Sequence, residues 1–426
     1  ANRVQERRGD LATSCTLPAR LNPLTHIVGC TSTVAGMVAV VRGSSIANVD
    51  GTVPISMADA PLTLFLCGDV MTGRGIDQIL SHPSAPDLHE PFVADAREYV
   101  RLAEEVPGAA PRSVNPAYIW GDAITEWEAV APVARIVNLE TSVTRSDEYE
   151  RGKSIHYRMH PENVGCLTAA RLDVCVLANN HVLDYGCAGL FETLETLQHA
   201  GIMSVGAGRN LDEARRPAMC SLSPGGRLIV AACAHGSSGV PDNWAALADD
   251  AGVNVLPDLS DETAAAVAGH LTSHKRPGDI TVLSMHWGDN WGYDVPRRHI
   301  EFAHRLVDCG LDIVFGHSSH HVRPLEVYHE KLILYGCGDF IDDYEGISGY
   351  EHYRDDLVLM FFPSVDPATG RLLSLRMTPL QIRKLRLNRA STEDSHWLCT
   401  TLNRISAPSG ARVDVTPDGA LTLALG

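Results

Sequence analysis

Several short apolar runs constrain what this 426-residue chain can fold into. They cover residues 62–69, 134–140, 172–181, 227–235, 279–288, 311–321 and 331–339. Nearly continuous Val, Ile and Leu in such short runs indicates strands that are buried on both faces. Segments with helical spacing, such as 190–201 and 296–310, lie between runs and end in Gly. The alternation predicts βαβ units and a largely parallel sheet in an α/β fold.

The runs also divide the chain. Residues 1–56 are rich in Ser, Thr, Gly, Arg and Asn without a sustained period, and we expect an irregular N-terminal extension. Residues 57–363 carry the runs and form the expected catalytic domain. Residues 364–426 contain a strand pair, a helix opened by a Ser-x-x-Asp box and a hairpin around Asp418-Gly419. We expect this tail to pack on the main domain.

Charge and hydropathy limit the classes of partner. The net charge of −17 disfavours nucleic acid and suits a metal or a cationic partner. The longest apolar stretch considered, residues 33–41, is far shorter than the ~18 residues of a membrane span. Cysteines within apolar runs, such as Cys67, Cys175 and Cys233, are typical of buried reduced thiols. We therefore expect a soluble, cytoplasmic protein without a membrane anchor.

Polar side chains stand at or just past the ends of these apolar runs. They are Asp69, Asn138, Glu140, Asn179, Asn180, His181, His286, His317, His320, His321 and Asp339. In open α/β sheets, ligands bind beyond the carboxyl ends of strands. Carboxylates, an amide and imidazoles suit a divalent ion such as Mn, Zn or Fe, and the sequence does not distinguish these from Ca or Mg. The predicted metal ligands are Asp69, Glu140, Asn180, His286, His317 and His320.

A second group of residues has more than one interpretation. We expect these residues to support the ligands or to contact substrate: Asn138, Asp184, Trp287, Trp291 and His321. Asp184 can orient His181 or cap a turn, and the two tryptophans can line a groove or pack in the core. The residue pattern alone leaves open which of His320 and His321 faces the site. An acidic segment with Asp339, Asp342, Asp343 and Glu345 is predicted to be a solvated face.

Beyond these patterns, the segments GDVMTGRG, NLE, LANNHVLDYGCAGLFETLETLQHAGI with GAGRNLDEARRP, MHWG, GHSSHH and LYGCGDF resemble the CapA (poly-γ-glutamate capsule) family. The resemblance covers roughly residues 62–345. It implies a fold like that of calcineurin-type metallophosphatases, a four-layer αββα sandwich with metals at the strand ends.

The resemblance also implies a role for each predicted ligand. Asp69 matches the first aspartate of the family, and Glu140 takes the place of a bridging aspartate. Asn180 is then a metal ligand, with His181 beside the reacting group. His286 matches a histidine on its own strand, and His317 and His320 match a closing histidine motif.

Two departures from that pattern matter. Met71 stands where metallophosphatases usually have a histidine two residues after the first aspartate, so one metal position loses a ligand. The closing motif is stretched to His317-Ser-Ser-His320-His321. Both changes weaken a two-metal phosphoester mechanism. The other position, with Glu140, Asn180, His286 and His317, keeps its full set.

Three functions are compatible with this pattern: phosphoester hydrolysis, poly-γ-glutamate capsule production, and acid–base chemistry on a peptide. Enzymes similar to the family include epimerases that invert the Cα centre of the C-terminal residue of lasso-peptide precursors. A metal on the neighbouring carbonyl oxygen would stabilise the enolate, and His181 with Asp69 or His320 would move protons on opposite faces. We expect a metal-dependent epimerase of a precursor peptide. A capsule biosynthesis protein, a phosphoesterase and a non-catalytic metal-binding module are the alternatives.

Overall fold

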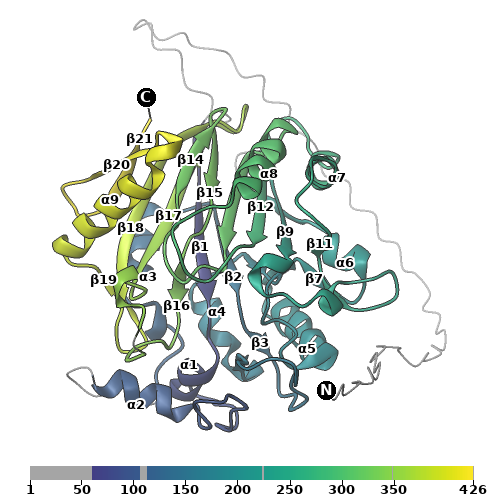
Figure 1. The fold of residues 1–426 in the computed structure, drawn as a ribbon, viewed down its shortest axis with the longest axis vertical. Helices are drawn as coiled ribbons and strands as arrows, with labels where there is room; N and C mark the ends of the chain where they lie inside the picture. Colours follow the sequence, from purple (N-terminus) through teal and green to yellow (C-terminus); the bar gives the residue numbers. More distant parts are fainter. Residues whose placement is uncertain (1–59, 106–112, 223–224, 348, 426) are drawn as a thin grey trace, which may run out of the picture.

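Two β-sheets packed face to face form the centre of the protein (Figure 1). The computed structural model describes residues 60–105, 113–222, 225–347 and 349–425. The predicted extension, residues 1–56, lies outside the described residues.

The first sheet has ten strands and is mixed. Its order is β20 (Arg412–Val415), β21 (Leu421–Ala424), β18 (Leu372–Ile382), β17 (Leu357–Val365), β1 (Leu62–Val70), β2 (Ala134–Leu139), β5 (Val174–Val176) and β6 (Met203–Val205), with β16 (Asp339–Ile341) on β1 and β19 (Leu387–Arg389) on β18. Strands β1, β2, β5, β6 and β16 run parallel, whereas β17 to β21 pair antiparallel. The prediction of a largely parallel sheet therefore holds for one half of this sheet only. Short turns join several of the later strands, and a short turn permits only antiparallel pairing.

The second sheet has seven strands and is mainly parallel. Its order is β11 (Val255–Leu256), β9 (Arg227–His235), β12 (Ile280–His286), β13 (Ile313–His317), β15 (Lys331–Leu334) and β14 (Leu325–Tyr328), with β8 (Ala218–Ser221) on β9. Two-stranded pairs also form between β3 (Ser142–Val143) and β4 (Arg158–Met159) and between β7 (Ala207–Gly208) and β10 (Gly252–Val253).

Alternation along the second sheet explains why its strands are apolar on both faces. Val230 and Val282 point into the core shared with the first sheet, whereas Ala231 and Leu283 point into a separate cluster under two helices. Side chains alternate between faces along a strand, so both faces need apolar residues when both are covered.

Helices cover the outer face of each sheet and complete four layers. The helices are α1 (Arg74–Ile79), α2 (Arg97–Glu105), α3 (Ala123–Val130), α4 (Gly165–Ala169), α5 (Gly186–His199), α6 (Leu211–Arg215), α7 (Asp261–Thr272), α8 (Arg297–Asp308) and α9 (Thr392–Ser406). Helices α7 and α8 close the outer face of the second sheet (Figure 1). On the first sheet, Trp127 of α3 packs edge-on against Phe65 of β1 at 5.1 Å between ring centroids. The expected α/β fold with four αββα layers is confirmed.

The C-terminal strands belong to the first sheet. Helix α9 begins after Ser391, whose side chain accepts a hydrogen bond from the Asp394 amide, as the Ser-x-x-Asp box predicts. The hairpin of β20 and β21 turns at Gly419, where φ is +79°. Among the described residues, every helix is too short or too polar to cross a membrane.

Candidate metal centre

The carboxyl ends of strands from both sheets meet at one place. In the second sheet, His286 at the end of β12 lies directly opposite His317 at the end of β13. In the first sheet, Asp69 on β1 lies opposite Asn138 on β2 and Asp339 on β16. Parallel pairing brings residues at equal depth side by side, so polar groups that are distant in the sequence become neighbours.

Four of the predicted ligands converge there. One ligand atom from each of Asp69, His286 and His317 lies within 4.8 Å of the others. The Nδ1 atoms of His286 and His317 are 2.7 Å apart, and Asp69 Oδ1 is 3.7 Å from His317 Nδ1. Glu140 Oε2 is 3.9 Å from His286 Nδ1. All four side chains are buried.

Asn180 is placed beside this group through its contact with His286. Its Oδ1 accepts a hydrogen bond from His286 Nε2 at 3.1 Å, on the ring nitrogen that faces away from His317. An amide oxygen can only accept, so this bond puts the His286 proton on Nε2 and leaves Nδ1 with a lone pair. In this geometry Asn180 orients a histidine ligand, a role that the sequence did not suggest.

Asn138 links the carboxylates of the two strands. Its Nδ2 donates to Asp69 Oδ1 at 2.7 Å and to Glu140 Oε2 at 2.9 Å. Its own Oδ1 accepts from Asn179 at 3.0 Å. The chain of amides holds both carboxylates at fixed positions, and Asn179 also accepts from the His181 backbone amide at 3.1 Å.

The electrostatics of the site favour a bound cation. Burial raises the pKa of Asp69 to about 6, against the opposing effect of His320 and of hydrogen bonds from Asn138, and burial also raises the pKa of Glu140. Burial lowers the pKa of His317 to about 3 and also lowers that of His286. Within the described part of the chain, neither carboxylate has a Lys or Arg within 4.0 Å. Oxygen donors without a cation beside neutral imidazoles are a donor set that fits a divalent metal.

His181 forms a separate dyad at the edge of this group. Its Nδ1 lies 2.6 Å from Asp184 Oδ2, and its Nε2 is 3.8 Å from Glu140 Oε1. Lys153 donates to Asp184 Oδ1 and to the Asn180 carbonyl. Burial lowers the His181 pKa to about 4, although Asp184 opposes the shift. The Nδ1–H therefore donates to Asp184, and Nε2 is an unprotonated acceptor at neutral pH.

Of the two adjacent histidines, His320 faces the site. Its Nδ1 lies 3.0 Å from Asp339 Oδ1 and its Nε2 lies 2.9 Å from Asn290 Nδ2. His321 instead stacks on Tyr353, with 4.4 Å between ring centroids, and its Nδ1 donates to the Val322 carbonyl.

The two predicted tryptophans have different surroundings. Trp287 is 2% exposed, and its indole donates to the Tyr335 carbonyl at 3.1 Å, so it packs in the core between β12 and α8. Trp291 stacks on Tyr350 at 3.8 Å and lies 5.3 Å from the His320 ring. Trp291 is thus the one of the pair that reaches the site.

The prediction of a solvated acidic face is wrong for three of its residues. Asp339, Asp342 and Asp343 are at most 2% exposed. Asp339 is buried because β16 pairs with β1, and Asp343 because it binds the buried guanidinium of Arg74. One sequence signal could have indicated Asp339: the tripeptide Cys-Gly-Asp occurs at residues 67–69 and again at 337–339, each time after an apolar run.

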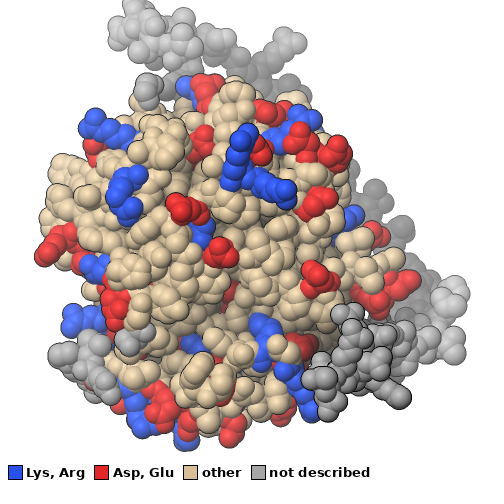
Figure 2. Space-filling model, in the orientation of Figure 1, with Lys and Arg blue, Asp and Glu red and all other residues tan. Residues whose placement is uncertain are grey.

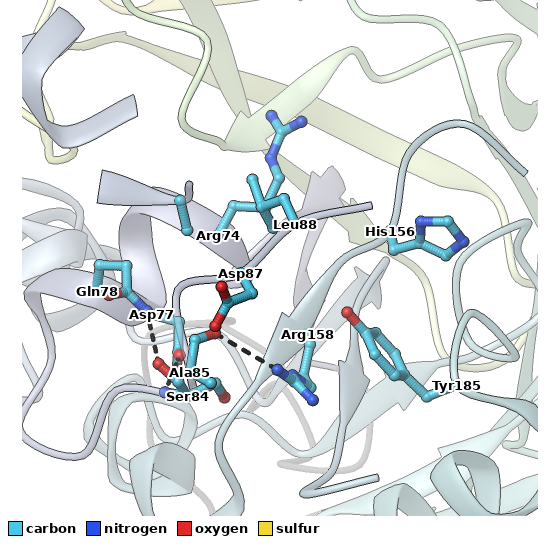
Figure 3. Close-up of a pocket in the computed structure, with 11 residues that line it drawn as sticks. Arg74, Asp77, Gln78, Ser84, Ala85, Asp87, Leu88, His156, Arg158 and Tyr185 are labelled. Carbon is cyan, nitrogen blue, oxygen red and sulfur yellow. Dashed lines mark hydrogen bonds between the residues drawn. The ribbon is translucent and has the colours of Figure 1, made fainter. Parts of the chain in front are cut away.

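Two cavities lie near these residues. Figure 3 shows the smaller, lined by Arg74, Asp77, Ser84 and Arg158 among others, with a volume of about 10 Å³. That volume holds about one water molecule and no substrate. A larger cavity of about 380 Å³ is lined by Asp342, Tyr344 and Asp355 among others. The Tyr344 ring is 5.3 Å from the His320 ring, so this cavity adjoins the candidate site.

Figure 2 shows the charges on one face of the molecule. Lys and Arg side chains lie there singly or in small groups among Asp and Glu.

Comparison with protein families gives one match that spans most of the described chain. Residues 63–344 match the model of "Bacterial capsule synthesis protein PGA_cap". The matched region begins in β1 and ends beyond β16, so it contains every predicted ligand.

Individual relatives agree with the family match. The chain is 50% identical, over 84% of its length and 95% of the relative's, to a probable polyglutamine synthesis accessory protein of Mycobacterium tuberculosis. It is 29% identical to the PGA biosynthesis protein CapA of Bacillus subtilis, over 77% of this chain and 73% of that protein. Among solved structures, a 5'-nucleotidase precursor from Thermus thermophilus aligns with a TM-score of 0.41 and 15% identity, over 81% of this chain and 59% of that one.

Proposed function

The chain belongs to the bacterial capsule synthesis protein family PGA_cap, and from this premise we propose that it is a metal-dependent enzyme acting on a glutamate polymer as an accessory to the synthesis of that polymer. The observation that carries the proposal is the convergence of Asp69, His286 and His317 ligand atoms within 4.8 Å in the protein interior. Side chains of this kind are seldom gathered away from water without a bound cation, because unpaired buried carboxylates are unfavourable.

The names of the relatives support a glutamate polymer as the substrate class. The two relatives described above carry names that refer to polyglutamine synthesis and to PGA biosynthesis.

The chain's own residues supply acid–base chemistry at that place. A divalent ion held by Asp69, Glu140, His286 and His317 would polarise a carbonyl oxygen of the substrate. His181 is an unprotonated base at neutral pH, with Nε2 directed toward Glu140. Asp184 holds the ring by accepting from Nδ1 and stabilises the imidazolium that forms when Nε2 takes a proton.

The proposal is tested by incubating the protein with Mn²⁺ and poly-γ-glutamate oligomers of defined length. Products are followed by mass spectrometry and by the ratio of D- to L-glutamate after hydrolysis. Wild-type protein is expected to change chain length or stereochemistry, and His286→Asn and Glu140→Gln are expected to remove the change. His304→Gln is the matched control, because His304 of α8 bonds Glu326 of β14 rather than a predicted ligand. Metal-loaded wild-type protein that leaves every oligomer unaltered would contradict the proposal.

Epimerisation of a peptide Cα is a second candidate, favoured by one observation. Two imidazoles flank the ligand group, each held by a buried carboxylate: His181 by Asp184 and His320 by Asp339. Inversion requires one group to remove a proton and another to return it on the opposite face. Deuterium incorporation at Cα in heavy water, without change of chain length, distinguishes inversion from hydrolysis. If the protein turns over a substrate without incorporating deuterium at Cα, epimerisation is excluded.

A further inference from the structure

We propose that the loop between β18 and β19 is a docking surface for the anionic chain of a glutamate polymer, which it binds beside the metal centre through Arg383, Lys384 and Arg386. The inference rests on the proposed function, because it takes the polymer as the ligand. It gives a place outside the metal centre to the part of the polymer that does not react. Each residue of such a chain carries a carboxylate, so a surface that binds it has to be basic.

The sequence concentrates positive charge in this loop. Four of the seven residues 383–389 are Lys or Arg, and none is Asp or Glu. The whole chain carries a net charge of −17, so the protein as a whole repels a polyanion. Binding of a glutamate polymer therefore needs a local group of cations, and this loop supplies one.

A cavity of about 330 Å³ opens beside these side chains. It is lined by Arg383, Lys384, Arg386, Tyr118 and Asn388, so every lining residue is basic or uncharged. Guanidinium and ammonium groups form short, charge-assisted hydrogen bonds with carboxylates. A carboxylate that enters the cavity meets three cations.

Two of the three cations are available to a ligand. Within the described part of the chain, the side-chain nitrogens of Arg383 and Lys384 make no hydrogen bond and lie more than 4.0 Å from every carboxylate oxygen. Glu345 lies nearby, but its two oxygens accept from the backbone amides of Lys384 and Leu385 at 2.7 Å and 2.6 Å. Its charge is therefore directed at the backbone of the loop and not at the cavity.

The third cation, Arg386, is held in place by its surroundings. Its guanidinium lies 3.6 Å from Asp122 and 5.8 Å from the ring centroid of Tyr118. A Cβ on Gly121 would stand 2.6 Å from Arg386 Nε, so glycine is needed for the side chain to pass. A guanidinium has five N–H donors, and one distant acid leaves donors for a further carboxylate.

The backbone of the loop is strained in a way that presents these side chains. Lys384 and Leu385 both have left-handed backbone angles, with φ of +59° and +52°. Two such residues in succession are unfavourable without glycine. Asn388 Nδ2 stabilises the turn by donating to the carbonyls of Arg383 at 3.0 Å and of Arg386 at 2.8 Å. The turn buries Leu385 and leaves Arg383 exposed, and strain of this kind is retained where it positions groups for function.

Strand pairing places the loop at the same edge of the first sheet as the metal centre. Strand β17 pairs antiparallel with both β1 and β18, so β18 ends where β1 ends. Glu345, which binds the loop, is six positions after Asp339, the neighbour of Asp69, so the two are at most about 22 Å apart. Arg383 also lines the cavity of about 380 Å³ that adjoins the metal centre. Carboxylates such as Asp355 line that cavity too, so we expect the polymer's own carboxylates on the loop.

The test is binding of a fluorescently labelled oligomer of γ-linked glutamate to the full protein, measured by fluorescence anisotropy. The protein is treated with a chelator, so that metal-dependent turnover does not alter the oligomer. Wild type is expected to bind this oligomer and not the uncharged oligomer of γ-linked glutamine. The double variant Arg383→Gln with Lys384→Gln is expected to raise the Kd about 10-fold.

The matched control is the double variant Arg215→Gln with Arg216→Gln. These two adjacent arginines are exposed, and their replacement changes the net charge by the same amount. They lie at the end of α6, which is on the opposite side of the molecule from β19 in Figure 1. The control is expected to keep the Kd of wild type, because only the position of the lost charges differs.

Three results would overturn the inference. They are an equal Kd for the loop variant and wild type, equal binding of the glutamate and glutamine oligomers, and single-stranded DNA of equal charge that binds as tightly as the glutamate oligomer. The DNA result would assign the loop to a phosphate backbone. If the double variant does not fold, Arg383→Gln alone is expected to raise the Kd about 3-fold, and a wild-type value would overturn the inference.

This experiment and the test of the proposed function can fail separately. Docking is read as binding without metal, whereas the proposed function is read from products formed with Mn²⁺. Products without binding to the loop would overturn the docking surface alone. Binding that depends on the loop without any product would overturn the proposed function and leave the docking surface.

Discussion

His286 Nδ1 and His317 Nδ1 face each other at 2.7 Å across neighbouring parallel strands. Asn180 fixes the proton of His286 on Nε2, so its Nδ1 carries a lone pair. At His317, Nε2 lies 2.5 Å from the Ser284 hydroxyl, which can accept or donate. When Ser284 accepts, both Nδ1 lone pairs point toward the same place, and a shared cation stabilises that arrangement.

Ser284 should therefore control metal affinity without touching the metal. Ser284→Ala removes the acceptor that selects the metal-binding tautomer of His317, and the Kd for Mn²⁺ is expected to rise about 10-fold or more. Ser395→Ala, at a buried serine of α9, is the control and should leave the Kd unchanged. The Kd is measured by competition with a chelator, and equal values for Ser284→Ala and wild type would exclude this role.

Metal removal should destabilise the protein more at neutral than at acid pH. In the metal-free protein, burial raises the Asp69 pKa from 3.8 to about 6, so the folded state keeps a proton that the unfolded chain has already released. Stability of the metal-free protein is thus lost as the pH rises from about 4 to about 6. A bound cation compensates the ionised carboxylate. The difference in Tm between metal-loaded and chelated protein is expected to widen between pH 5 and pH 7.

The widening in Tm is checked by scanning calorimetry at constant ionic strength. Asp69→Asn has no carboxylate to ionise, so its chelated form should lack the part of the pH dependence that Asp69 contributes. A difference in Tm that is constant or narrows over this range for wild type would refute the assignment.

Asp184 should act on turnover rather than on metal binding. Its carboxylate accepts hydrogen bonds from His181 Nδ1, from the Tyr157 backbone amide at 2.8 Å and from the Lys153 side chain. Asp184→Asn replaces one acceptor oxygen by a donor and disturbs the His181 tautomer, and kcat is expected to fall about 100-fold or more. Metal content should stay at the wild-type value. Asp147→Asn, at an exposed carboxylate paired with Arg158, should keep full activity. A parallel loss of metal in Asp184→Asn would instead indicate a structural defect.

Glu126 of α3 should anchor the C-terminal strands. It accepts from the Thr378 hydroxyl at 2.6 Å and from Arg376 and Arg389. These hydrogen bonds outweigh the effect of burial and lower the Glu126 pKa. The ionised side chain therefore contributes to the stability of the folded state above about pH 4.5, and this contribution is lost as the pH falls below that value. Glu126→Gln is expected to lower the free energy of unfolding by about 1–2 kcal/mol at pH 7, a figure reduced for the partly exposed arginines.

The Glu126 effect is measured by urea denaturation at pH 7 and at pH 4. The difference between Glu126→Gln and wild type should shrink at the lower pH. If the two proteins differ in free energy of unfolding by the same amount at pH 7 and at pH 4, the effect of Glu126→Gln comes from packing and not from the charge of Glu126.

Local pattern was sufficient for the strands and for the kinds of ligand. A strand that is buried on both faces appears in the sequence as consecutive apolar residues. The first polar side chain after them marks the end of the strand. The sequence could therefore predict Asp69, Glu140, His286 and His317 as candidate ligands, and the structure brings their side chains together. The same local logic located the Ser391 cap of α9 and the turn at Gly419.

Long-range pairing was decided only by the tertiary structure. The sequence predicts Asp339 as part of an acidic loop. In the structure β16 pairs with β1 and buries Asp339 beside Asp69, although the two residues are 270 positions apart. Asn180 is predicted as a ligand from its place after an apolar run, but only the structure shows that its oxygen contacts the ring of His286, on a strand of the other sheet. The sequence by itself determined which elements form and which chemical groups end them. The packing of the two sheets decided which of those groups lie together in one buried site. Burial and strand pairing depend on residues that are far apart in the sequence, so a short segment does not reveal them.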